Sequence, residues 1–269
     1  MLNKAKEFFL FLKEIYQKRQ LIWSLAKNDF RSKFAGSFFG IFWSFVIPII
    51  TILVFWFVFT VFKSSPVDNI PFIAWFVPAY IPWMFFTDCL TGSVNVLYEY
   101  SYLVKKIKFR TSMLPLVKVL SCLFLNLFFI GFIFIIMAVF QIPITPYVLQ
   151  IPYYMAAEIL LCVGVSWILS SVAVFFKDLS AMVNIIVQLG FWLTPIFWTV
   201  EGMPSWLGVI AKANPVYYIT QGMRDTFLYQ RGFWENPEQT LYFWIFTGVL
   251  FVIGAMVFRK LRPHFADVL

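Results

Sequence analysis

The chain has 269 residues and a formal net charge of +8; 61% of its residues are hydrophobic, 22% are aromatic and only 13% are charged. An ordinary soluble domain is about 45–50% apolar and about 25% charged, and soluble monomers rarely expose large apolar surfaces, so this composition excludes a water-soluble globule. Because a membrane span needs roughly 20 apolar residues, a chain of this length holds about six of them, and we expect an all-α membrane protein.

Residues 4–19 form the first expected element, an amphipathic helix. Its apolar residues Phe8, Leu12 and Ile15 recur at helical spacing, with Lys and Glu on the other faces. This pattern suits a helix that lies in the membrane surface and turns its basic residues towards anionic lipid. A solvated connector helix is the alternative. We assign residues 1–34 to this cytoplasmic, interfacial N-terminal segment.

Six apolar segments follow, and each is predicted to be a membrane-spanning helix because an open backbone cannot satisfy its hydrogen bonds in hydrocarbon. The expected spans cover residues 38–62, 70–96, 114–140, 152–176, 181–200 and 241–258. They form one transmembrane domain over residues 35–262, which is followed by a cytoplasmic tail at residues 263–269. The second span is the weakest, since it contains Asp88 and several prolines that should bend it.

Lysine and arginine are distributed unevenly between the two sides that these spans define. All of them lie on one side except Lys63, Lys212, Arg224 and Arg231. The positive-inside rule makes the basic side cytoplasmic. An even number of spans then places both termini in the cytoplasm, as in many multi-pass membrane proteins.

The segment between the fifth and sixth spans, residues 201–239, is expected outside the cell. It is amphipathic and is interrupted by Pro204, Pro215 and Pro237. Its apolar stretches are too short to cross a bilayer. We expect short re-entrant helices that dip into the outer leaflet and return, because irregular backbone at that depth has to be buried in protein. A loosely ordered external loop is the alternative.

The sequence lacks the residues that an enzyme would need. It has no G-x-x-x-x-G-K-S/T phosphate loop, and its one histidine, His264, lies in the charged tail. No nucleophile with a partner base and no paired metal ligands can be assembled, and Cys89, Cys122 and Cys162 are interpreted as buried free thiols. We therefore predict no catalytic residue, cofactor or metal in this chain. Its basic residues flank apolar spans, which indicates contact with membrane lipid and not with nucleic acid.

Three further features of the sequence can each be interpreted in two ways. The stretch from Gly36 to Gly40 has the small-xxx-small spacing that lets helices approach closely, or is a simple break before the first span. The loop from Glu99 to Arg110 mixes aromatic, aliphatic and basic residues, and either docks a cytosolic partner or only sets the topology. Asp88 is the one acid that we place deep in a span, where it is a functional candidate or is hydrogen-bonded to a neighbouring helix.

Four motifs occur in order along the chain. The first is the run from Leu25 to Pro48, which contains Asp29, Arg31, Gly36, Ser37, Gly40, Trp43 and Pro48. It is followed by Phe176-Lys-Asp-Leu-Ser180, by Thr194-Pro-Ile196, and by Asn214-Pro215 with Arg224 beyond it. This ordered set resembles the ABC-2 type exporter permeases, most of all the branch that exports lipid-linked polysaccharides. Phe34, Phe39 and Lys177 depart from that pattern, where Tyr, Leu and Arg are common.

The resemblance implies a homodimer that works with two copies of a separate ATP-binding subunit, which would hold the ATP and its magnesium. It also implies that this subunit docks on the loop after the second span, on the turn after the fourth and on the N-terminal amphipathic helix. The ATPase-coupling candidates are Glu99, Tyr100, Leu103, Lys105, Lys106, Lys177 and Asp178. The substrate would be a polymer on polyprenyl diphosphate, and Arg31 and Lys33 are candidates for contacts with its headgroup, although topology alone also explains them.

We therefore predict the transmembrane subunit of an ATP-driven exporter of a lipid-linked glycopolymer. Teichoic acid is placed first, and O-antigen or capsular polysaccharide second. One alternative is an ABC-2 exporter of a drug or small lipid. Another, from a different class, is a membrane scaffold or an ion-coupled carrier. A carrier would need an ionisable group near the middle of the membrane, and Asp88 is the only one that we assign there.

Overall fold

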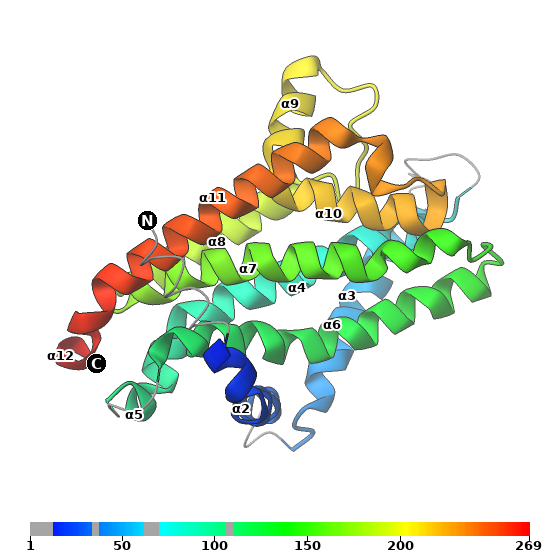
Figure 1. Ribbon diagram of the computed structural model, residues 1–269. Coiled ribbons are helices and arrows are strands. Elements are labelled where there is room, and N and C mark those ends of the chain that lie inside the picture. The colour runs from blue at the N-terminus through cyan, green and yellow to red at the C-terminus, as the bar shows by residue number, and fades with distance from the viewer. Residues whose placement is uncertain (1–12, 34–37, 62–69, 106–109) are drawn as a thin grey trace.

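The computed structural model describes residues 13–33, 38–61, 70–105 and 110–269. Within these ranges the chain is almost entirely helical and has no β-strand. Five of the described helices are long and apolar enough to cross a membrane: α3 (Phe42–Val61), α4 (Phe72–Glu99), α6 (Leu114–Val139), α7 (Ile151–Ala173) and α11 (Pro237–Leu261). A sixth, α8 (Leu179–Leu193), is apolar but shorter. Together they form an elongated bundle, which confirms the prediction of an all-α membrane protein (Figure 1).

The centre of the bundle consists of α4, α6 and α7. They pack on one another through a continuous apolar core that includes Trp75, Phe76, Phe129 and Ile133, and α11 packs along α7. By contrast, α3 lies at the periphery, at a steep angle to the other long helices, and packs mainly against α4 (Figure 1). Most of the α3 surface is therefore left uncovered by this chain.

The fifth expected span, residues 181–200, is helical only as far as Leu193. Both the backbone N–H and the hydroxyl of Thr194 donate to the carbonyl of Gly190, at 2.8 and 2.7 Å. The next residue, Pro195, has no N–H with which to continue the helix. The chain then runs on irregularly to Val200, with Thr194 and Ile196 fully buried. Irregular backbone at this depth requires partners for its carbonyl groups.

At the N-terminal side, residues 13–17 are helical and α2 (Arg19–Ser32) follows. Ile22, Ala26 and Asp29 recur at helical spacing and are buried, on a helix that packs against α6. Helical structure thus extends well beyond the amphipathic helix expected at residues 4–19. The first part of that helix lies outside the described residues, as does Gly36, where the small-residue pattern begins.

Short helices connect α8 to α11, as expected for this segment. They are α9 (Ser205–Ala213), α10 (Pro215–Arg224), the π-helical turn η3 (Asp225–Tyr229) and the 3-10 turn η4 (Phe233–Glu235). Asn214 caps α10, because its side-chain oxygen accepts a hydrogen bond from the N–H of Val216 at 3.0 Å. α10 then packs against α4, α7 and α11, so it lies inside the bundle and not in a loose loop.

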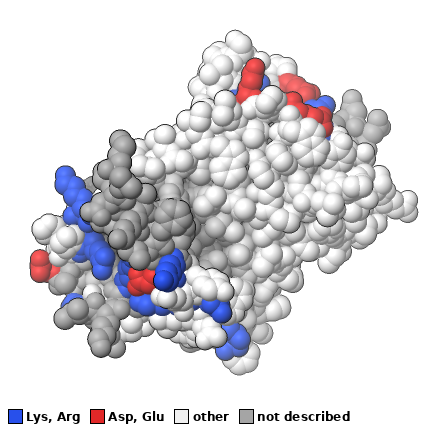
Figure 2. All heavy atoms as spheres, viewed as in Figure 1, with Lys and Arg blue, Asp and Glu red and all other residues white. Residues whose placement is uncertain are grey.

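On the face of the bundle shown in Figure 2, charged side chains gather at the two ends and leave a wide uncharged band between them. We call one end the basic end. It carries α2, α5 (Ser101–Val104) and the C-terminal η5 (Arg262–His264) and α12 (Phe265–Val268). The opposite end, near α9 and the start of α11, is the acidic end, where Glu201, Asp225, Glu235 and Glu238 outnumber Lys212 and Arg231. An uncharged band between polar ends suits a protein that crosses a bilayer.

Candidate functional site

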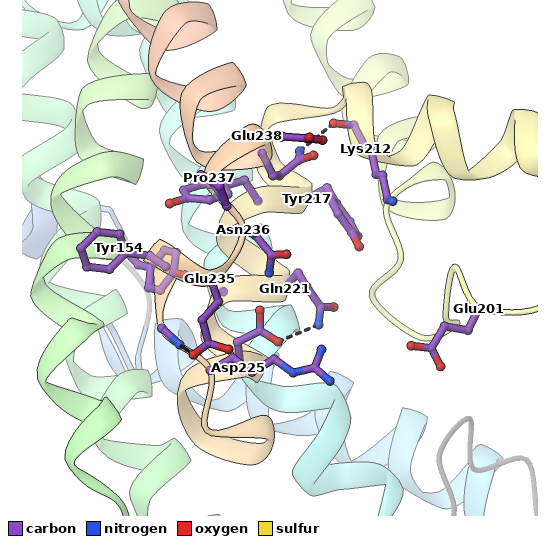
Figure 3. Close-up of a pocket in the computed structure, with 16 residues that line it drawn as sticks. Tyr154, Glu201, Lys212, Tyr217, Gln221, Asp225, Glu235, Asn236, Pro237 and Glu238 are labelled. Carbon is purple, nitrogen blue, oxygen red and sulfur yellow. Dashed lines mark hydrogen bonds between the residues drawn. The ribbon is translucent and has the colours of Figure 1, made fainter.

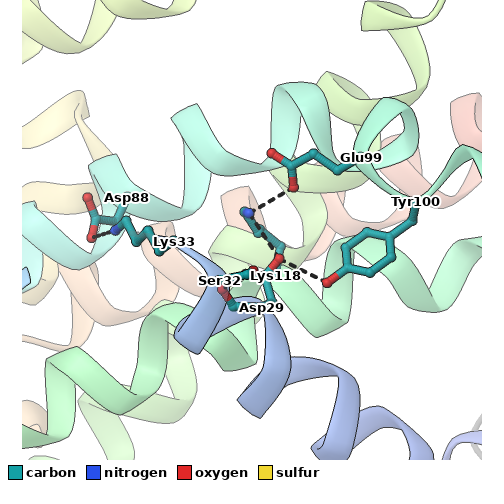
Figure 4. Close-up of polar contacts among 7 residues, drawn as sticks. All are labelled: Asp29, Ser32, Lys33, Asp88, Glu99, Tyr100 and Lys118. Atoms are coloured by element: carbon teal, nitrogen blue, oxygen red, sulfur yellow. Dashed lines mark hydrogen bonds and ion pairs between the residues drawn. The ribbon is translucent and has the colours of Figure 1, made fainter. Parts of the chain in front are cut away.

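A network of polar side chains joins three helices at the basic end. Lys118 of α6 lies 3.2 Å from the Oδ1 atom of Asp29 in α2 and 3.0 Å from the Oε2 atom of Glu99 in α4. The hydroxyl of Tyr100, at the end of α4, donates to the same Oδ1 atom of Asp29 at 3.0 Å (Figure 4). These contacts tie α2 to both α4 and α6.

Asp29 lies at the centre of this network and is only 7% exposed. A buried carboxylate is stable only if it is paired and hydrogen-bonded, and Lys118 and Tyr100 fulfil both conditions. Burial and the charge of Asp29 raise the pKa of Tyr100, so its phenol remains protonated and keeps donating. The sequence motif contained Asp29 but indicated no role for it.

Two further ion pairs link the N-terminal helices to the bundle. Glu14 accepts from Lys18 and from Arg110, each at 2.8 Å. Although burial raises the pKa of Glu14, these two cations lower it more, and the net shift is downwards. Lys33 lies 3.1 Å from Asp88. Lys33, one of the two residues predicted to contact the substrate headgroup, is thus paired with Asp88. The other, Arg31, is exposed on α2.

The other coupling candidates lie close to this network. Leu103 is half-buried in α5, Lys105 is exposed beside it, and Lys106 lies outside the described residues. Lys177 and Asp178 are exposed on the turn between α7 and α8. The hydroxyl of Tyr98 in α4 donates to the carbonyls of Ala173 and Val174, at 3.4 and 3.1 Å. The segment after α4 and the turn after α7 are therefore tied to each other, and both are open at the basic end.

Arg224, at the end of α10, lies inside the bundle and is 1% exposed. Its guanidinium group donates to the carbonyls of Trp75 at 3.1 Å, of Pro195 at 2.6 Å and of Ile196. It also stacks over the Trp75 ring, 3.5 Å from the ring centre. Arg224 thus supplies the hydrogen bonds that the irregular chain after α8 lacks. It was counted from the sequence as an external charge.

Sequence reasoning missed Glu158, a second acid inside a span. It lies in α7, is 3% exposed, and its Oε1 atom has no hydrogen-bond partner among the described residues. Asn126 of α6 and Met223 of α10 line the same small gap, which is too small for a water molecule. Glu158 lies within the predicted span 152–176, so the assignment of Asp88 as the only acid deep in a span was wrong.

A cavity of about 500 Å³ opens at the acidic end (Figure 3). Its floor is buried and its rim exposed. Tyr217, Gln221 and Asp225 share one face, since they are spaced by four residues along α10 and into η3. This polar stripe in an apolar stretch is the signal by which the sequence could have indicated the cavity. The floor and rim residues are Tyr154, Tyr218, Gly222, Asp225, Glu201, Lys212, Arg231, Glu235, Asn236 and Glu238.

Hydrogen bonds position the acidic groups of the cavity. The side chain of Gln221 donates to the Oδ1 atom of Asp225 at 3.1 Å, and the N–H of Gly232 donates to Glu235 at 2.7 Å. Burial raises the pKa of Asp225 from 3.8 to about 6. In the described part of the chain, no ion pair joins the carboxylates of the cavity to Lys212 or Arg231.

The long apolar helices, with a short helix packed among them before the last, define a multi-pass helical membrane protein. Residues 20–228 match the family described as ABC-2 type transporter, and the chain belongs to that family. It is 26% identical over 247 residues to the O-antigen export system permease protein RfbA of Klebsiella pneumoniae, which covers 91% of this chain and 93% of that protein. It is 25% identical over 259 residues to RfbA of Myxococcus xanthus, over 95% of this chain and 98% of that protein. The family expected from the sequence motifs is thereby confirmed.

Proposed function

We propose that this chain is the transmembrane subunit of an ATP-driven exporter that moves a lipid-linked glycopolymer across the cytoplasmic membrane of a bacterium. The observation that carries the proposal is the end-to-end similarity to permeases that are named for O-antigen export. O-antigen, capsular polysaccharide and teichoic acid all belong to the proposed substrate class. The earlier preference for teichoic acid remains a prediction within that class.

ATP binding is assigned to a separate cytosolic subunit, because the sequence contains no phosphate loop. We expect two copies of that subunit and a second copy of this chain. The exposed side chains of Lys105, Lys177 and Asp178 are available for docking at the basic end. From there, the contacts of Asp29 and Lys118 would carry a movement of the docked subunit into α2, α4 and α6. ATP can drive the switch only if it binds the two states with different affinity.

The basic end is placed in the cytoplasm by the positive-inside rule, and both termini with it. The acidic end then faces outwards. In this orientation Arg31 and Lys33 lie at the side from which a polyprenyl diphosphate would enter. Arg31 is exposed and can meet the headgroup directly, whereas Lys33 would first have to leave Asp88.

The test is co-expression of the tagged chain with the ATP-binding subunit encoded nearest to it. We expect the two to purify together from detergent and the complex to hydrolyse ATP. A chain that stays alone would contradict every exporter hypothesis. Substrate is tested by depletion of this chain in cells: the lipid-linked polymer should accumulate inside, while normal polymer export together with lost efflux of a drug would support the drug-exporter alternative.

A further inference from the structure

We propose that the cavity at the acidic end binds a short segment of the exported glycan as it leaves the permease, and that it favours neutral sugars or amino sugars over phosphodiester units. The inference rests on the proposed function for the origin of the glycan. It assigns a binding site outside the basic end, where ATP coupling is expected. It also divides the proposed substrate class according to charge.

The size and depth of the cavity suit a small polar ligand. Its volume of about 500 Å³ falls within the range of about 300–1,000 Å³ that is typical of small-molecule sites. Tyr154, Tyr218 and Asp225 at its floor are at most 7% exposed, so they are already held in place by the fold. A floor of this kind needs little reordering when a ligand binds.

The chemistry of the lining fits sugar hydroxyl groups. Tyr217, Gln221 and Asp225 are presented side by side from α10 and η3 (Figure 3). A carboxylate accepts from hydroxyl groups, an amide both donates and accepts, and a tyrosine adds an aromatic face for the C–H face of a sugar ring. The rim contributes a second amide, Asn236, and a second carboxylate, Glu235. A ligand with many hydroxyl groups can form hydrogen bonds with these carboxylates and amides together.

Asp225 is the residue on which the proposal depends most. Gln221 donates to its Oδ1 atom, and within the described residues no hydrogen bond occupies the other oxygen, which can accept from a ligand. The backbone that carries Asp225 is a π-helical turn that ends at Gln230 in the left-handed conformation, with a φ of 52°. Such turns cost stability and are frequent at functional sites.

The charge of the cavity selects among glycans. Glu201, Glu235 and Glu238 stand around the rim with Asp225 below them, against Lys212 and Arg231 alone. A cavity with this excess of carboxylates repels a phosphodiester backbone and attracts an ammonium group. A metal ion does not explain the carboxylates, because no three His, Cys, Asp or Glu side chains in the described ranges converge as ligands.

The test uses the full-length chain in lipid nanodiscs and saturation-transfer NMR with three probes. These are the neutral triacetylchitotriose, the cationic chitotriose and the anionic tri(glycerol phosphate). The two sugar trimers should bind, and the glycerol phosphate trimer should bind at least tenfold more weakly. Asp225→Asn should weaken the sugar trimers at least tenfold, whereas Asp267→Asn at the basic end, the matched control, should leave them unchanged.

A second variant keeps the test decisive if Asp225→Asn does not fold. The double substitution Glu201→Gln and Glu238→Gln changes only exposed rim residues, and it should strengthen binding of tri(glycerol phosphate) at least threefold. Equal binding of all three probes, or no change in either variant, would overturn the inference. If cells export the glycan but no probe binds, the cavity proposal fails and the proposed function stands. If the chain fails to assemble with its ATPase, the proposed function fails whatever the probes do.

Discussion

Gly222 of α10 lies directly against the ring of Tyr154 of α7. A Cβ atom at this position would overlap two ring carbons of Tyr154 and would lie 2.6 Å from its hydroxyl oxygen. The absence of a side chain at Gly222 therefore sets how deeply α10 sits in the bundle. It also sets the depth of the cavity, because both residues belong to its floor.

Gly222→Ala should lower the free energy of unfolding by about 1–3 kcal/mol, the usual cost of overpacking a buried contact. Thermal unfolding in detergent would measure it. The control is Gly248→Ala in α11, where a Cβ would meet nothing within 4 Å. That change should be neutral or should stabilise the helix by about 0.5–1 kcal/mol. Equal effects of the two substitutions would mean that the contact with Tyr154 does not limit packing.

Arg224→Lys should destabilise the protein by about 3 kcal/mol or more, although it keeps the positive charge. A lysine has no planar fork with which to reach the carbonyls of Trp75, Pro195 and Ile196 together, so buried carbonyls lose their donors. Folded yield and detergent melting temperature would report the loss. Arg231→Lys, an exposed exchange of the same kind, should change neither. A stable Arg224→Lys protein would show that the chain after α8 is held by other contacts.

Glu158→Met should leave the fold intact and raise the free energy of unfolding by about 1–3 kcal/mol. The substitution replaces a buried acid, whose Oε1 atom has no hydrogen-bond partner in the part of the chain that the structure describes, with an apolar side chain of similar length. Chemical unfolding and an export assay should be run on the same variant. If stability rises while export is lost, the acid is retained for transport. If stability falls, the carboxyl group makes a stabilising contact that the structure does not reveal.

Leu103→Asp should abolish substrate-stimulated ATP hydrolysis in the assembled complex while the spans remain inserted. Leu103 is half-buried at the basic end, where α5 would meet the ATP-binding subunit, and a charge there disrupts an apolar contact. The control is Val268→Asp, the same kind of change at an exposed position of α12 at that end. ATP hydrolysis that is unaffected by Leu103→Asp would remove α5 from the coupling mechanism.

Stability should depend on pH through Asp225. Its pKa is raised in the folded protein from 3.8 to about 6, so the folded state binds the proton more tightly than the unfolded state. The free energy of unfolding should therefore fall by about 2–3 kcal/mol as the pH rises from about 4 to 6, and the effect should level off above that range. The difference in melting temperature between the wild type and Asp225→Asn, followed across that range, measures it. The melting temperature of the wild type minus that of Asp225→Asn should fall as the pH rises from about 4 to 6, and a rise would contradict the prediction.

The helical architecture could be predicted because it depends on local properties of the chain. α3, α6 and α11 are long apolar segments, and hydrocarbon leaves them no conformation but the helix. The end of α8 at Leu193 also has a local cause in Thr194 and Pro195. Both residues belong to a recognisable sequence motif, but the predicted span 181–200 ran through them. Type and order of elements follow from composition, whereas a helix end depends on single residues.

The candidate sites were harder to predict from the sequence, because they depend on which helices become neighbours. Asp29 and Lys118 are far apart in sequence, and only the packing of α2 on α6 brings them together. Arg224 was interpreted as an external charge because the rule for topology counts charges and not their burial. Its carbonyl partners come from two other segments, and periodicity cannot identify them.

The contrast between α3 and α4 has a consequence for how the protein is made. α3 carries no charge and leaves most of its surface bare, including Leu53 and Phe57. α4 is largely enclosed by other helices and contains Pro78, Pro82 and Asp88. During synthesis α3 can leave the translocation channel for lipid on its own, whereas α4 gains its cover only after α6 and α7 have emerged. If translation stalls after α4 and before α7, the first span is therefore already inserted in lipid, whereas the second still lacks the helices that cover it.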